Sequence, residues 1–343
     1  MSQLTGTELR RPRVCVLAPT PLLTIEIDPF DPRHPRNDSS TGRPPGDVHL
    51  HPGGQGLWVA RMAASLGAEV TVCGPFGGEV GPLLITSLTS SNLTVRPVTY
   101  LGGNGAYVYD CSSGERRVAA HMVPAQLTRH ELDDLYGTVL VEALDADVVS
   151  ITGADPSHVV PSGFLARLVR DIRASDIPVV TDLSGEAAAL VAAQGPSVLK
   201  MSHEELISAG LAGDDSLDTL VHAATALLEA GVGAMVVSRA SEPALLVTAE
   251  GANLVEGPVI TPQDHRGAGD SMTAGIAVGL GRGEPINQAV RLGAAAGALN
   301  VTRRGLGTGR REHIERFASL IDVKPLAPDE AGAASAPVQQ GKV

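Results

Sequence analysis

The 343-residue sequence has only three cysteines and no apolar run long enough to cross a bilayer. Cys15, Cys73 and Cys111 are scattered and form no Cys-x-x-Cys pair, which is typical of reduced thiols in a cytosolic protein. A membrane-spanning helix needs roughly 20 consecutive apolar residues. These absences argue against a disulfide-built scaffold and a membrane partner, and they predict a cytoplasmic protein.

Positive charge is also scarce. The formal net charge is −12, which argues against a nucleic acid or an anionic membrane surface as partner. Lys200, Lys324 and Lys342 are the three lysines, and none of them completes the G-x-x-x-x-G-K-[ST] pattern of a P-loop. A P-loop NTPase is therefore disfavoured.

The pattern that dominates is an alternation of short β-branched runs with Ala-rich amphipathic stretches. Strands are predicted at residues 14–17, 70–74, 148–152, 179–182, 198–200 and 235–238. Such runs suit strands that are buried on both faces, as in a parallel sheet with helices on each side. The predicted fold class is α/β, with a doubly wound and mostly parallel sheet flanked by helices.

Two segments break this alternation and predict a small second sheet. Residues 21–51 hold a β-like run and a Pro-rich polar loop, and residues 97–122 read as a β-hairpin around the turn "CSSG". The two excursions are expected to meet as a β lid over the body, or alternatively to be surface hairpins without function. The body is expected at 12–20, 52–96 and 123–322, with flexible tails at 1–11 and 323–343.

The stretch "DHRGAGDSMTAG" predicts a phosphate site. Its glycine-rich turn into a helix leaves unpaired backbone N–H groups at the positive end of the helix dipole, and Arg266 adds positive charge. Gly267 and Gly269 allow a close approach that a side chain would prevent. Met272 stands where the dinucleotide pattern G-x-G-x-x-G needs glycine, so a dinucleotide-dependent oxidoreductase is the weaker alternative.

Asp270 makes the site more specific. A carboxylate beside a phosphate site is a poor choice for binding alone, but it suits a base that accepts a proton from an attacking hydroxyl. The alternative is that Asp270 only caps the helix, because aspartate is favoured at helix N-termini. The predicted chemistry is phosphoryl transfer.

Several segments together resemble the ribokinase-like (PfkB) carbohydrate kinases, and most closely their 1-phosphofructokinase and tagatose-6-phosphate kinase branch. "RGAGDSMTAG" resembles the C-terminal signature of that family and "GGQGLWVARMAASLGAEVTVCGPFGGEVG" its N-terminal signature, with "VVTDLSGEA", "VLKMSHEEL" and "TRRGLGTG" as further matches. The similarity spans residues 12–320. It implies ATP and Mg²⁺, a sugar or sugar phosphate as acceptor, and a homodimer joined through the lids.

The resemblance also implies roles for individual residues. Asp270 would be the base, and the backbone amides of Gly267, Ala268 and Gly269 would form the anion hole. Glu205 falls at the acidic position of the Mg²⁺-linked motif. The nucleotide cleft would be lined by Lys200, Ser238, Arg239, Arg266, Asn300 and Gly305. The acceptor would be held by Gly53, Gly54, Gln55 and Arg117, and Asn104 would either bind a substrate hydroxyl or supply a turn.

The acceptor side departs from the family pattern. Gln55 replaces the usual lysine and Trp58 the usual asparagine, while Leu22 stands where the first strand usually carries a sugar-binding aspartate. Glu26 or Asp28 are candidates to replace that aspartate. These departures leave open a non-catalytic sugar- or nucleotide-sensing relative of the same fold.

Overall fold

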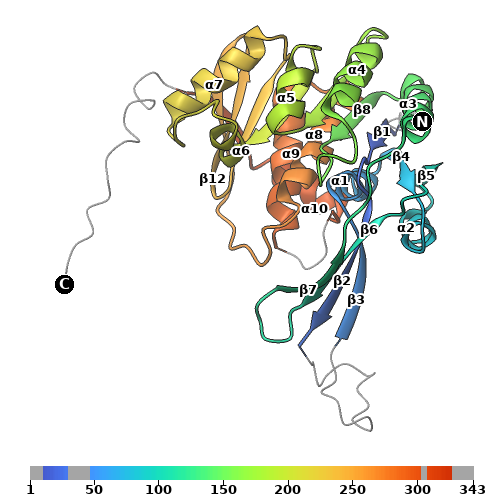
Figure 1. Ribbon diagram of the computed structural model, residues 1–343. Helices are drawn as coiled ribbons and strands as arrows, with labels where there is room; N and C mark the ends of the chain where they lie inside the picture. Colours follow the sequence, from blue (N-terminus) through green and yellow to red (C-terminus); the bar gives the residue numbers. More distant parts are fainter. Residues whose placement is uncertain (1–10, 30–46, 303–306, 327–343) are drawn as a thin grey trace, which may run out of the picture.

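The computed structural model describes residues 11–29, 47–302 and 307–326, which form two β-sheets and ten helices (Figure 1). The large sheet has the strand order β14-β13-β12-β11-β10-β9-β8-β1-β4-β5. Its parallel strands are β1 (Arg13–Leu17), β4 (Glu69–Phe76), β5 (Leu93–Thr99), β8 (Val148–Thr152), β9 (Val179–Asp182), β10 (Val198–Ser202) and β11 (Met235–Arg239). An antiparallel extension adds β12 (Glu242–Thr248), β13 (Gly251–Glu256) and β14 (Asp322–Pro325).

Two layers of helices cover the two faces of this sheet, because successive strand residues point to opposite faces. Cys15 and Leu17 of β1 pack into one apolar core, whereas Val14 and Val16 pack into the other. The first core is completed by α3 (Arg129–Leu144), α4 (Ser162–Arg173), α5 (Gly185–Ala192), α6 (His203–Ser208) and α7 (Leu217–Glu229). The second is completed by α1 (Gln55–Ser65), α2 (Val80–Leu88), α8 (Ala268–Gly281), α9 (Ile286–Asn300) and α10 (Arg311–Ala318). The predicted doubly wound α/β fold is confirmed.

The small sheet projects from one end of the body (Figure 1). Its order is β3-β2-β6-β7, formed by β2 (Leu22–Asp28), β3 (Asp47–Gly53), β6 (Gly105–Asp110) and β7 (Arg117–Met122). The two β excursions therefore pair with each other, because β2 runs parallel to β6. Residues 30–46 of the Pro-rich loop lie outside the described residues.

Three predicted boundaries differ from the structure. Residues 52–53 belong to β3 of the small sheet rather than to the body, since Pro52 and Gly53 pair with Leu23 and Leu22 of β2. Residues 97–99 belong to β5 of the large sheet rather than to the small one, since Pro97, Val98 and Thr99 pair with β4. Residues 323–325 belong to β14 rather than to a flexible tail, since they pair with β13 at the sheet edge. An edge strand tolerates Pro325, which cannot donate a backbone hydrogen bond. Among the described residues, no helix combines the length and the apolar character needed to cross a membrane.

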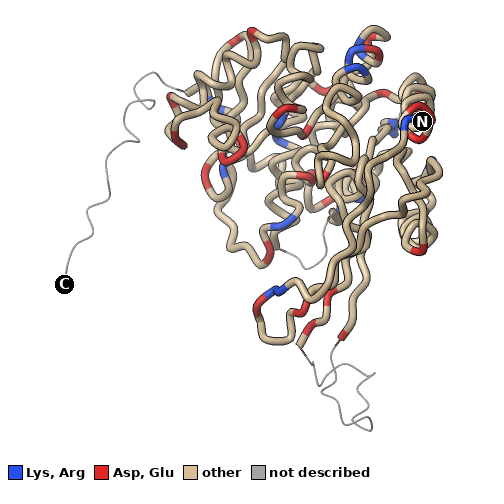
Figure 2. Tube along the Cα trace, in the orientation of Figure 1, with Lys and Arg blue, Asp and Glu red and all other residues tan. Residues whose placement is uncertain are grey.

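The small sheet has one mainly polar and one mainly apolar face, because β2 and β3 alternate polar and apolar side chains, although the pairing of β6 with β7 is irregular. Glu26 and His49 lie opposite each other on the polar face, and Thr24 and His51 form the next pair on it. The other face carries Ile25, Ile27, Val48, Leu50, Val108, Ala120 and Met122. Val48, Leu50 and Met122 are exposed large apolar side chains in this chain. Figure 2 shows acidic positions along these strands and both signs of charge in the hairpin between β6 and β7.

Candidate active site

The turn before α8 forms a nest of backbone donors, defined here as residues 267–270. Gly267 is the N-cap residue with φ 69°, a left-handed conformation that glycine adopts without strain. The first helical bond of this turn runs from the Ser271 N–H to the Gly267 carbonyl at 2.9 Å. The amides ahead of it therefore lie at the positive end of the helix dipole, where an anion is held best.

Asp270 lies in the first turn of α8 and is buried, with 7% of its surface exposed. Burial and, next, the neighbouring Asp182 carboxylate raise the pKa of its carboxyl to about 8, against the opposing effect of the Lys200 ammonium. The helix has no side-chain cap, so the alternative that Asp270 serves as the cap residue is wrong. A carboxyl group with a raised pKa beside a nest of backbone donors is suited to proton transfer.

Lys200 and Asp182 form a buried ion pair beside Asp270. The Lys200 Nζ lies 3.1 Å from both carboxylate oxygens of Asp182, and the Thr273 hydroxyl donates to Asp182 Oδ2 at 2.8 Å. Burial lowers the pKa of Lys200, but the carboxylates of Asp182, Asp270 and Glu205 outweigh it, so the pKa is raised. Lys200 is therefore a cation placed among three carboxylates.

The ammonium of Lys200 also explains a glycine of the nest. A Cβ added at Gly269 would lie 2.5 Å from the Lys200 Nζ, a distance that no side-chain carbon tolerates. Gly269 thus lets the lysine head approach the first turn of α8. Sequence reasoning assigned no role to Asp182, although its position at the end of a buried strand in "VVTDLSGEA" was an available signal.

A cleft of about 310 Å³ opens at the carboxyl ends of β8 and β9, where α/β sheets bind their ligands. Its lining residues are Gln55, Gly153, Ala154, Asp155, Ser157, Asp182, Leu183, Ser184 and Glu205. Gln55 and Glu205, predicted for the acceptor and for the metal, are therefore brought together with Asp182. None of these lining residues is a lysine or an arginine.

Glu205 lies in the first turn of α6 and takes part in a capping box. Its Oε2 accepts the Ser202 N–H at 2.6 Å, and the Ser202 hydroxyl accepts the Glu205 N–H at 3.1 Å. No group of three His, Cys, Asp or Glu side chains forms a ready metal site within the described residues. Carboxylates that face one cleft do fit Mg²⁺ that arrives with nucleotide phosphates, because that ion keeps most of its waters and takes one or two carboxylates.

The two glycines before α1 are required by the fold itself. A Cβ at Gly53 would lie 2.5 Å from Leu22 Cδ1, and one at Gly54, whose φ is 98°, would lie 2.6 Å from the Thr20 carbonyl oxygen. The Trp58 indole N–H donates to the Pro52 carbonyl at 3.1 Å, which fixes the same turn. These contacts account for the Gly-Gly pair, and an approach of the acceptor to it stays a prediction.

Asn104 does not offer its amide to a substrate. Its side chain is 1% exposed, accepts the Gly77 N–H at 2.9 Å and donates to the carbonyls of Pro21 at 3.0 Å and Pro75 at 2.9 Å. The predicted substrate role is therefore wrong, because every polar atom of the amide is used to join three segments at the base of the small sheet.

Asn300 has a comparable role behind the nest. Its Nδ2 donates to the Arg266 carbonyl at 2.7 Å and its Oδ1 accepts the Gly307 N–H at 3.1 Å. Both polar atoms support the backbone on either side of the site, and a contact of Asn300 with a nucleotide stays a prediction. Gly305 lies outside the described residues.

Ser238 and Arg239 lie at the carboxyl end of β11, beside the end of β10. Ser202 and Ser238 are register partners, and His203 Nδ1 lies 3.3 Å from the Ser238 carbonyl oxygen. The Arg239 Nη1 donates to the Pro243 carbonyl at 3.2 Å within the following hairpin. Both residues are at the predicted end of the sheet, and their contact with a nucleotide stays a prediction.

Arg266 joins the nest to the small sheet. Its Nη1 lies 2.6 Å from Glu26 Oε1 on β2, and its Nη2 lies 2.6 Å from Asp264 Oδ2. Burial would raise the pKa of Glu26, but Arg266 and Arg116 outweigh burial and the pKa is lowered. The Glu26 carboxylate therefore pairs with Arg266 and Arg116. The sequence alone did not predict the contact between Glu26 and Arg266.

Arg116, rather than Arg117, is the hairpin arginine that packs on the small sheet and pairs with Glu26. The Arg116 Nε lies 3.2 Å from Glu26 Oε1, and its guanidinium lies 3.3 Å from the centre of the Tyr109 ring. The Arg117 side chain is 70% exposed and pairs with Glu115 at 2.6 Å. A contact of Arg117 with a substrate phosphate in its own subunit therefore stays a prediction without a supporting contact.

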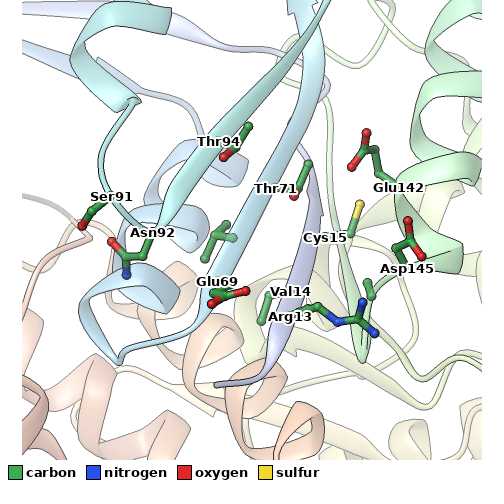
Figure 3. A pocket seen from close by; sticks show the side chains of 12 residues that line it. Arg13, Val14, Cys15, Glu69, Thr71, Ser91, Asn92, Thr94, Glu142 and Asp145 are labelled. Carbon is green, nitrogen blue, oxygen red and sulfur yellow. The ribbon is translucent and has the colours of Figure 1, made fainter. Parts of the chain in front are cut away.

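A separate hollow of about 220 Å³ lies at the amino ends of β1 and β4 (Figure 3). Arg13, Glu69, Asn92 and Asp145 are among its lining residues. The nest and the Lys200–Asp182 pair lie at the opposite ends of the parallel strands. This hollow therefore has no part in the candidate active site.

Comparisons with known proteins agree with the geometry. The model of the pfkB family of carbohydrate kinases matches residues 21–313. The chain is 30% identical over 336 residues to the ATP-dependent 6-phosphofructokinase isozyme 2 of Mycobacterium tuberculosis, covering 97% of this chain and 95% of that protein. It is 28% identical over 284 residues to the 1-phosphofructokinase of Escherichia coli, covering 81% and 88%. The phosphofructokinase-2 of Escherichia coli in complex with fructose-6-phosphate superimposes with a TM-score of 0.71 at 25% identity, covering 90% and 98%.

Proposed function

We propose that this chain, which belongs to the pfkB family of carbohydrate kinases, transfers a phosphoryl group from ATP to a hydroxyl of a sugar phosphate. The observation that carries the proposal is the buried Asp270 carboxyl in the first turn of α8, beside the amides of the nest. The names of the relatives support ATP as donor and a fructose phosphate as the first acceptor to test.

Asp270 acts as the base in this proposal. The acceptor hydroxyl attacks the terminal phosphorus, the bond from that phosphorus to the ADP oxygen breaks, and the hydroxyl proton passes to Asp270. A positioned base of this kind contributes about 10²–10⁴ in rate. The amides of Gly267, Ala268 and Gly269 stabilise the charge on the transferred group, because donors that are already oriented need no reorganisation.

Lys200, Asp182 and Glu205 support the same step. The Lys200 ammonium lowers the pKa of Asp270 and so favours the form that accepts a proton. Glu205 and Asp182 would hold Mg²⁺, which when bound neutralises phosphate charge. Asp182 is already bonded by Lys200 and Thr273, so its contribution would run through the water shell of the ion.

A free sugar is the second candidate for the acceptor. The cleft is lined by Asp155, Asp182 and Glu205 together with neutral polar groups, and none of its lining residues is basic. Carboxylates accept hydrogen bonds from sugar hydroxyls but repel a phosphate. The non-catalytic sensing alternative is not favoured, because the family match and the relatives named as phosphofructokinases support a kinase.

The exposed apolar face of the small sheet supports a homodimer in which two small sheets pack on each other. Ile25, Ile27, Val48, Leu50 and Met122 lie on that face. Contiguous exposed apolar surface of this kind marks an interaction site in soluble proteins. A charged Leu50→Arg variant should shift the species seen by light scattering from dimer to monomer, and a wild type that is monomeric would contradict this assembly.

An acceptor panel tests the proposed function. Wild type and Asp270→Asn are incubated with MgATP and fructose 6-phosphate, fructose 1-phosphate, tagatose 6-phosphate or free hexoses, and ADP and the phosphorylated product are both quantified. We expect one hexose phosphate to give equal amounts of ADP and product with wild type only. If no phosphorylated acceptor gives product but a free sugar does, the second candidate, a free sugar, becomes the acceptor class of this enzyme.

A further inference from the structure

Four charged side chains join the small sheet to the loop before the nest. Glu26 and Arg116 come from the small sheet and its hairpin, and Asp264 and Arg266 come from the body. Arg266 Nη1 to Glu26 Oε1 is 2.6 Å, Arg266 Nη2 to Asp264 Oδ2 is 2.6 Å, and Arg116 Nε to Glu26 Oε1 is 3.2 Å. The Glu26–Arg266 pair is called the clasp below.

The body fixes its half of the clasp independently of the small sheet. The Arg266 N–H and Nε both donate to Asp264 Oδ1 at 3.0 Å, and the Arg266 carbonyl accepts from Asn300 at 2.7 Å. The Arg266 side chain is therefore held in place directly before Gly267, the first residue of the nest. Glu26 is the partner of Arg266 that comes with the small sheet, 240 residues away in the chain.

The clasp acts far from the base of the small sheet. Leu22 is the first residue of β2, and Glu26 lies four residues further along it. At roughly 3.3 Å per residue this places the clasp about 13 Å from the base. A contact at that distance sets the angle between the small sheet and the body far more tightly than a contact at the base would.

We propose, resting on the kinase function above, that Glu26 is a positioning residue that holds the small sheet closed over the acceptor cleft through Arg266. Closure has two consequences for a kinase: it holds the acceptor, and it excludes water. When water replaces the acceptor hydroxyl, it attacks the terminal phosphorus, the bond to the ADP oxygen breaks, and ADP, inorganic phosphate and a proton are formed.

The charges predict an opposite effect on the two substrates. The four side chains sum to zero, so the positive charge of Arg266 is compensated while the clasp is closed. Glu26→Gln leaves a net positive charge beside the nest, which attracts nucleotide phosphates. The KM for the acceptor should therefore rise while the KM for ATP stays level or falls, a split that a general loss of stability would not produce.

Two variants test the clasp. Glu26→Gln removes the carboxylate charge at nearly constant shape. Asp110→Asn is the matched control, since Asp110 is an exposed carboxylate of the same sheet that accepts the nearby Ser112 N–H at 2.9 Å. For each protein we measure both KM values, the ratio of ADP to phosphorylated acceptor, and amide hydrogen exchange over residues 22–28.

The expected result for Glu26→Gln is an acceptor KM raised about tenfold, the scale of one lost charge-assisted hydrogen bond, and an ADP-to-product ratio well above one. Exchange over 22–28 should be faster than in wild type, and Asp110→Asn should match wild type throughout. An active wild type with Glu26→Gln unchanged in both ratio and exchange overturns the clasp alone. A wild type that phosphorylates no acceptor overturns the proposed function, and the inference that rests on it.

Discussion

Replacement of Lys200 by methionine should destabilise the protein strongly. The Lys200 side chain is 7% exposed and that of Asp182 is 3% exposed, and the ammonium lies 3.1 Å from both oxygens of that carboxylate. Methionine fills a similar volume but leaves the Asp182 charge buried. Of the two side chains that donate to this carboxylate, Lys200 and Thr273, only Thr273 then remains. Breaking one side of a buried pair typically costs about 3–5 kcal/mol. That is a large part of the about 5–15 kcal/mol by which a domain is usually stable.

Urea unfolding followed by far-UV circular dichroism measures this loss. Lys324→Met is the matched control, because Lys324 is an exposed lysine that pairs with Glu256 at 3.0 Å, and exposed pairs contribute little to stability. Lys200→Met combined with Asp182→Asn should recover most of the loss, because the buried Asp182 charge that lost its partner is then removed as well. The reasoning is refuted when Lys200→Met unfolds at the urea concentration of wild type, or when the double variant is no more stable than the single one.

Three further outcomes follow from the same site. The pKa of Asp270 is raised to about 8, chiefly by burial, and only the carboxylate form accepts a proton, so kcat/KM should rise with pH through that value. A pH profile of kcat/KM that stays flat down to about pH 5 would contradict the role of Asp270 as base. Asn104→Ala removes three hydrogen bonds and should lower the free energy of unfolding by about 2–3 kcal/mol, and a loss below about 0.5 kcal/mol in urea unfolding would be inconsistent with its contacts. Gly269→Ala should displace the Lys200 head and lower kcat at least about tenfold in steady-state assays, whereas Gly137→Ala, whose Cβ meets nothing within 4 Å, should leave kcat unchanged.

The body of the fold was predictable because its signals are local. Strands buried on both faces read as continuous apolar runs, and the predicted 148–152 and 179–182 coincide with β8 and β9. The glycine-rich turn before α8 is equally local, since the left-handed Gly267 and the first turn that follows it occupy adjacent positions. Local structure that depends on a few neighbouring residues can therefore be predicted from their sequence.

The contacts that were missed join residues far apart in the chain. Nothing near Glu26 indicates Arg266, and nothing in the neighbouring sequence separates Arg116, which pairs with Glu26, from Arg117, which pairs with Glu115. Asn104 was predicted either to bind a substrate hydroxyl or to supply a turn, but an amide can satisfy backbone groups of two other segments as readily as a sugar hydroxyl. Polar residue type alone does not separate these uses, because both require the same donors and acceptors.

The acceptor side was the least predictable part for the same reason. Gln55 lines the cleft, but the side chains around it come from the ends and following loops of β8 and β9 and from α6. Their joint acidity emerges only when the carboxyl ends of several strands meet at one edge of the sheet. The identity of the acceptor therefore depends on a surface that no single motif describes.

The most direct test of the central claim is a comparison of Asp270→Asn with wild type on the acceptor that wild type phosphorylates. Asparagine keeps the shape of the side chain and cannot accept the hydroxyl proton as a carboxylate does. We expect kcat to fall by about 10²–10⁴ while the Kd for ATP changes by less than about threefold. A variant that keeps near-normal kcat would show that Asp270 is not the base of this enzyme.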